Sequence, residues 1–73
     1  MIGLLVNDME KMEIEYLVRR EMEELLMDLD DHRIDQVIKH SMKERYSLLF
    51  KLFQRVASEK DCFKYMPKRS KYE

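Results

Sequence analysis

Three aspartates and a histidine, Asp28, Asp30, Asp31 and His32, stand within five residues near the middle of the chain. Carboxylate and imidazole groups bind metals and act as general acids and bases, so the cluster could be a metal or catalytic site. The same residue types also cap helices and form turns. The segment could therefore equally be a kink in one long helix or the corner between two helices.

Other candidates for chemistry are isolated. His32 and His40 are eight residues apart, too far to share one ion on a helix, and a single pair with i, i+4 spacing, His40 and Glu44, is explained by a surface contact. Cys62 is the only cysteine, and the one glycine of the chain rules out the glycine-rich loops that hold nucleotides. We predict a non-enzymatic protein that has no catalytic residue, metal or cofactor.

The composition is that of one small all-α domain over residues 1–73. Glu, Lys, Arg, Leu and Met dominate, whereas glycine and proline occur once each. The apolar run at residues 2–6 is too short for a signal peptide or a membrane span, and one cysteine permits no internal disulfide, so we expect a cytoplasmic protein without membrane contact. A chain of this size buries only about 60% of its unfolded surface, so a partner surface is expected to stabilise it.

Apolar periodicity predicts an antiparallel helical hairpin. The first helix is expected at about 8–28, with Asn7 as its cap and Glu10 completing a capping box. The apolar stripe that ends near residue 29 resumes at Ile34 about two residues out of register, which favours a corner at 29–32 over one continuous helix. Asp30 or Asp31 would cap a second helix at about 33–57, and residues 58–73 would form a short helix or a basic tail.

Charge is divided unequally along the chain. Residues 1–31 contain ten acidic and three basic residues, net −7, and residues 32–73 contain five and eleven, net +6. An acidic helix folded on a basic one gains complementary flanking pairs, although each exposed pair contributes only about 0–1 kcal/mol. The same asymmetry favours antiparallel association of two chains, so we expect a homodimer that completes a four-helix arrangement.

The second apolar stripe is broader than one partner helix covers, and Arg45 falls within it. We expect Arg45 to extend over the core or to pair with an acid of the first helix or of a second chain. Helix-in-groove docking on a protein partner is the predicted mechanism. The predicted partner-binding residues are Arg45, Tyr46, Leu49, Phe50 and Phe53, and exposed methionines at 9, 12 and 27 are further candidates.

The C-terminal segment offers an alternative function. Four basic residues alternate there with aromatic ones, a composition that suits phosphate contacts and base stacking. The alternative is thus a nucleic-acid-associated factor that uses Lys64, Lys68, Arg69 and Lys71.

The stretch RIDQVIKHSMKERYSLLFKLFQRVA, residues 33–57, resembles the IDEAL domain, a short helical module of small regulatory proteins in low-GC Gram-positive bacteria. The likeness rests on Ile34-Asp35 opening a helix, the aliphatic pair Val37 and Ile38, and the later aromatic-leucine pair Phe50 and Leu52. The resemblance implies a bacterial, non-enzymatic regulator or adaptor that binds proteins.

Overall fold

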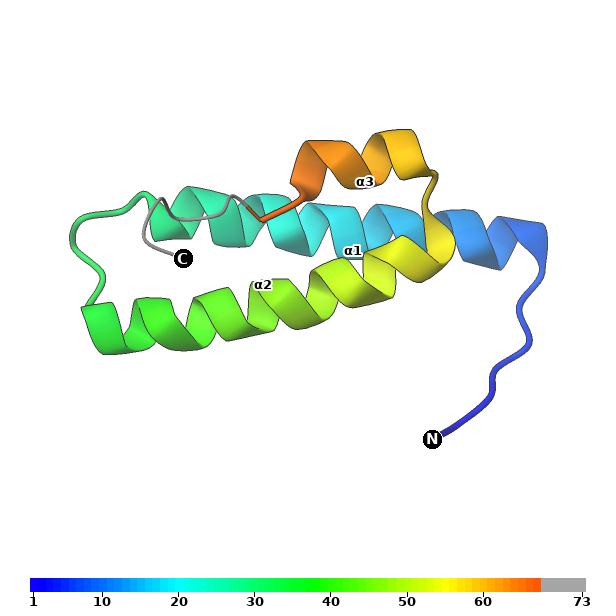
Figure 1. The fold of residues 1–73 in the computed structure, drawn as a ribbon, viewed down its shortest axis with the longest axis horizontal. Helices are drawn as coiled ribbons and strands as arrows, with labels where there is room; N and C mark the ends of the chain where they lie inside the picture. The colour runs from blue at the N-terminus through cyan, green and yellow to red at the C-terminus, as the bar shows by residue number, and fades with distance from the viewer. Residues whose placement is uncertain (68–73) are drawn as a thin grey trace.

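The computed structural model describes residues 1–67 and consists of three helices over that range. They are α1 (Asp8–Leu29), α2 (Gln36–Val56) and α3 (Glu59–Tyr65). Figure 1 shows α1 and α2 running side by side in opposite directions, with α3 folded back over them. The predicted all-α hairpin with a short C-terminal helix is confirmed.

The first helix begins as its sequence predicts. The Asn7 side chain accepts from the Glu10 backbone N–H at 2.8 Å, and Glu10 Oε1 accepts from the Asn7 N–H at 2.9 Å, which completes the capping box. Asp8 and Glu10 place negative charge in the first turn, where the helix dipole favours it.

The corner between the long helices is wider than predicted, and its cap is a different residue. The second helix begins at Gln36 rather than near residue 33, and Asp35 caps it by accepting from the Val37 N–H, so neither Asp30 nor Asp31 is that cap. Asp31 shapes the corner instead, because it accepts from the backbone N–H of Arg33 at 2.9 Å and from its guanidinium at 3.0 and 3.1 Å. The aspartate cluster thus has a structural role that needs no glycine.

The core lies between α1 and α2, and α3 closes one side of it. Its buried members come from the two long helices, and Met22 and Phe53 are fully enclosed. The six buried residues are Val18, Met22, Leu25, Tyr46, Phe50 and Phe53. The third helix begins at Ser58, whose hydroxyl accepts from the Asp61 N–H, and it ends before Pro67. None of the helices within residues 1–67 has the length and apolar content needed to cross a membrane.

Candidate functional site

One face of the hairpin is covered by α3. The Tyr65 ring lies edge-on to the Phe53 ring, with centroids 5.5 Å apart and planes at 76°. The Tyr46 hydroxyl donates a hydrogen bond to the Tyr65 carbonyl. Burial raises the pKa of the Tyr65 phenol, and the neighbouring Glu23 carboxylate raises it further, whereas Arg19 opposes them. Because Arg19 and Glu23 lie beside Tyr65, α3 covers their side of α1.

A salt bridge between the long helices marks the opposite face. Arg45 Nη2 lies 3.2 Å from Glu21 Oε2. Successive residues of an α-helix are rotated by about 100°, so Glu21 stands about 200° from both Arg19 and Glu23. The salt bridge therefore lies on the side of the hairpin away from α3.

Aliphatic side chains of α2 surround this salt bridge. Ile38 and Leu52 are seven residues before and after Arg45, which is two turns, so all three share one row of the helix. Leu48 and Leu49 lie one turn beyond Arg45. Leu48 is the most exposed of these leucines, at 68%, and Leu49 is half-buried against the core. The row is apolar except at Arg45.

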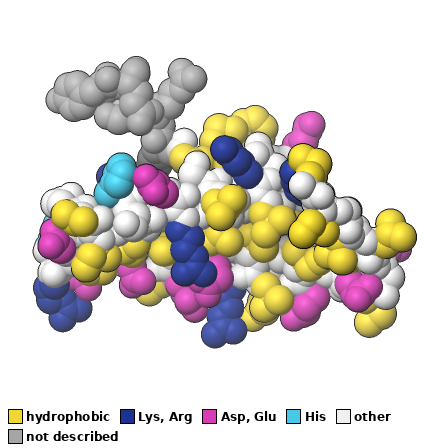
Figure 2. All heavy atoms as spheres, turned by 90° about the horizontal axis from the view of Figure 1, so that it is seen from below, with side chains coloured by type: hydrophobic (Ala, Val, Ile, Leu, Met, Phe, Trp, Pro, Cys, Tyr) yellow, Lys and Arg dark blue, Asp and Glu magenta, His cyan; other side chains and the backbone are white. Residues whose placement is uncertain are grey.

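The first helix contributes Leu17, one turn before Glu21 and 51% exposed. We call the whole surface the open face, and it comprises Leu17, Ile38, Leu48, Leu49 and Leu52 around the Arg45–Glu21 pair. Four of these five aliphatic side chains are between 42% and 68% exposed, whereas the core residues are at most 8% exposed. Figure 2 shows hydrophobic side chains spread along the molecule on the side of α2, interrupted by a group of basic and acidic ones.

Charged residues border the open face with opposite sign on the two helices. Arg55 lies two turns beyond Leu48 on α2, and Glu13 lies one turn before Leu17 on α1. Both are exposed, and within residues 1–67 neither of them forms an ion pair. The border of the open face therefore carries a basic side chain on α2 and an acidic one on α1.

Three of the five predicted partner-binding residues lie inside the hairpin. Tyr46, Phe50 and Phe53 face α1 and are 5%, 8% and 0% exposed, so they pack the core between the two long helices. Arg45 and Leu49 do lie on the open face, and Arg45 pairs with an acid of the first helix, one of the alternatives that the sequence left open. The exposed leucines Leu48 and Leu52 lie beside them.

The methionines at 9, 12 and 27 are exposed at 81%, 68% and 74%, as their edge positions suggest. Together with Tyr16, which is 47% exposed, they lie on the side of α1 that faces away from α2. The apolar residues Ile2, Leu4 and Leu5 precede α1 and are at least 80% exposed. Figure 1 shows this N-terminal segment extending away from the first turn of α1.

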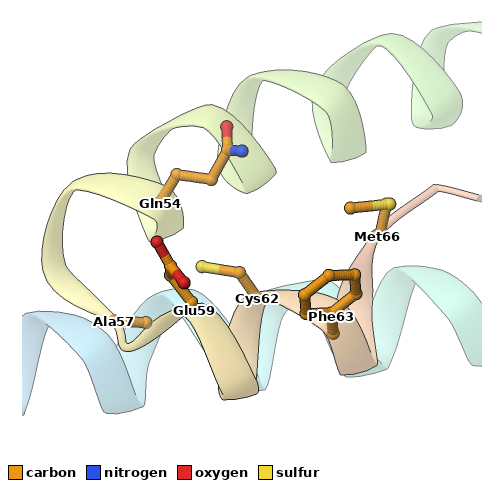
Figure 3. A pocket seen from close by; sticks show the side chains of 6 residues that line it. All are labelled: Gln54, Ala57, Glu59, Cys62, Phe63 and Met66. Atoms are coloured by element: carbon orange, nitrogen blue, oxygen red, sulfur yellow. The ribbon is translucent and has the colours of Figure 1, made fainter.

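A surface hollow of about 380 Å³ lies between the end of α2 and α3. It is lined by Gln54, Ala57, Glu59, Cys62, Phe63 and Met66, which Figure 3 shows around it. Cys62 is a half-buried free thiol that also packs against the core. Besides Cys62, the one ionisable side chain among the described residues that line this hollow is Glu59, and none of them is a histidine or a second cysteine.

The other side chains that the sequence suggested for metal or nucleic-acid binding do not form a site within residues 1–67. His40 Nε2 lies 3.0 Å from Glu44 Oε1 on the exposed side of α2, which is the helix-surface contact that explains their spacing. Among residues 1–67, no three His, Cys, Asp or Glu side chains gather closely enough to hold a metal ion. Lys64 is exposed in the last turn of α3, and the remaining residues of the basic set, Lys68, Arg69 and Lys71, lie outside the described residues.

Comparison with known proteins adds no family to these observations. No family model, curated protein or solved structure matches the chain.

Proposed function

We propose that this chain is a small, non-enzymatic regulatory or adaptor protein that acts by binding protein through the open face. The observation that carries the proposal is that α3 covers one face of the hairpin, whereas the other face presents aliphatic side chains to solvent. Exposed apolar surface bordered by charge is typical of protein-interaction sites. The resemblance of residues 33–57 to the IDEAL domain supports the same class of function, in bacteria.

The open face suits a helical partner. Its aliphatic row runs along α2 and Leu17 lies across from it on α1, so a helix laid on it would place its own apolar residues between them, as in helix-in-groove recognition. The Arg45–Glu21 pair lies at the centre and fixes the orientation of a partner by charge, because polar groups within an apolar interface favour one register. The single cysteine of the chain is consistent with action in the cytoplasm.

Capture from the native cytosol tests the proposal with a matched pair of variants. Leu48→Glu with Leu52→Glu places two charges on the open face, whereas Met27→Glu with Phe63→Glu makes the same charge change elsewhere on exposed helical positions. Glutamate is a good helix former, so both variants should keep the helical circular-dichroism signal of the native chain. Proteins captured by the native chain and the control, but lost from the open-face variant, are the expected result.

The opposite result would refute the proposal. An open-face variant that folds and captures the same proteins as the native chain would show that this face is not the binding surface. Substitution of Phe53 would not serve this purpose, because its side chain is fully buried and its loss would report on folding.

A further inference from the structure

We propose that the partner on the open face is a second copy of this chain, related by a twofold axis that runs parallel to the helices. Each α2 then lies antiparallel on the α1 of the other copy, and the pair forms a four-helix bundle. The inference deepens the proposed function and rests on it, because it assigns an occupant to the same face.

Charge selects this arrangement. Within its bounds α1 carries eight acidic and three basic residues, net −5, and α2 carries one acidic and five basic residues, net +4 with its histidine neutral. Two hairpins can stack face to face about a twofold axis in the interface in two ways. One way places α1 on α1 and opposes like charges, whereas the axis parallel to the helices places each basic α2 on an acidic α1.

The proposed arrangement also determines which charged residues of the two copies lie at the same height along the helix axes. The salt bridge places Arg45 level with Glu21 within one copy, and an axis parallel to the helices preserves that level in the other copy. Arg55 lies ten residues beyond Arg45, which is level with the residue ten before Glu21. Glu13 of the second copy stands two residues from that level, about 3 Å along the axis, and it forms no ion pair within residues 1–67.

The centre of the interface is self-complementary as well. Arg45 and Glu21 have side chains that are 59% and 44% exposed in the single chain. In the proposed dimer each Arg45 lies level with two Glu21 carboxylates, its own and that of the second copy. The two salt bridges would then form one alternating cluster, with the open-face leucines packed on either side.

The available area fits a closed dimer. Helices of about 21 residues are roughly 30 Å long, and two that pack 8–10 Å apart present a face about 20 Å wide. This face has an area on the order of 600 Å² per copy, at the lower end of the size range of specific interfaces. The dimer is therefore expected to dissociate on dilution.

Sedimentation equilibrium of the full chain over a concentration series tests the proposal. The native chain should approach twice its 9.0 kDa mass and go no higher. Leu48→Glu with Leu52→Glu should remain at 9.0 kDa throughout. Arg55→Glu should weaken association by about three- to tenfold, since it opposes like charges across the interface.

A matched control and a rescue separate specific pairing from net charge. Lys43→Glu makes the same change of charge on an exposed residue of α2 away from the open face and should associate like the native chain. Addition of Glu13→Lys to the Arg55→Glu variant should restore part of the lost affinity. Equal weakening by the control, or no restoration, would overturn the proposed arrangement.

A native chain that stays at 9.0 kDa at the highest attainable concentration, or that grows beyond a dimer, would overturn the self-pairing. That failure is distinguishable from failure of the proposed function. A monomeric chain that still loses its captured proteins when Leu48 and Leu52 are replaced retains the protein-binding face and loses only its assignment to a second copy.

Discussion

The two faces of the hairpin differ in what covers them and in the kind of side chain that each uses. On the covered face, Tyr65 packs on the aromatic core, and the Tyr46 hydroxyl has a backbone acceptor. On the open face the side chains are aliphatic, and the polar pair at its centre faces solvent. The aromatic side chains of α2 fill the core, so the apolar side chains of α2 on the open face are leucines and an isoleucine.

The largest expected effect on stability comes from comparing two methionines of α1, one in the core and one on the surface. Met22→Ala should lower the free energy of unfolding by about 2–5 kcal/mol, because the fully buried side chain leaves a cavity. Met27→Ala, at a position 74% exposed, should change it by no more than about 0.5 kcal/mol. Urea titrations followed by circular dichroism measure both. Equal effects of the two substitutions would refute the assignment of the core.

The attachment of α3 is tested by Tyr46→Phe. The substitution removes the hydroxyl that donates to the Tyr65 carbonyl and should cost about 0.5–1.5 kcal/mol. Tyr16→Phe is the control, since Tyr16 is 47% exposed on α1 and should be nearly neutral. Faster amide hydrogen exchange in α3 of the Tyr46 variant would show that the loss is local, and unchanged exchange would show that this hydrogen bond does not hold α3.

Alkaline pH should weaken the covered face. Burial raises the pKa of Tyr46, and the neighbouring Tyr65 raises it further. Unfolded tyrosine titrates near pH 10, so the unfolded chain loses these protons first and stability falls as the pH rises above about 10. The informative quantity is a difference between two variants, in which contributions from other groups cancel: Tyr46→Phe should show a shallower decline than the native chain. Identical slopes would contradict this account.

The smallest effect concerns the corner and acid pH. The Arg33 side chain and then its backbone N–H lower the pKa of Asp31 by hydrogen bonding. A lowered pKa in the folded state means that this stabilisation is present above the unfolded value near 3.9 and is lost as the pH falls through the lower folded value. Asp31→Asn should therefore flatten the acid limb of the stability profile slightly. Asp28→Asn is the control, and it should leave that limb closer to the native one.

The hairpin was predictable because its signals are local. Asn7 and Glu10 mark the first helix, and the change in apolar phase near Ile34 marks the corner. The position of the second cap was not predictable, because four aspartates, at 28, 30, 31 and 35, offer similar chemistry. Asp35 directly precedes the helix and accepts from the Val37 N–H, whereas Asp31 forms three hydrogen bonds with Arg33 in the corner.

It was harder to predict from the sequence which residues of the second apolar stripe are buried and which are exposed. Tyr46, Phe50 and Phe53 follow i, i+4, i+7 spacing, and this aromatic row is the one that α1 covers. Leu48 and Leu52 fall in the neighbouring rows and are as apolar, so periodicity alone gives one broad stripe. The side that stays open depends on where α3 packs, which is a long-range contact. The size and spacing of the aromatic residues were the signal that could have identified the inner row.

A dilution series followed by methyl NMR tests the central claim, that the face opposite α3 is the surface that binds protein and pairs two copies. With rising concentration, the account predicts that methyl signals of Leu17, Ile38, Leu48 and Leu52 shift together along one binding curve. Methionine signals at 9 and 27 and those of the core should stay in place. Shifts confined to α3 or to the N-terminal residues, or no shifts at any concentration, would contradict the claim.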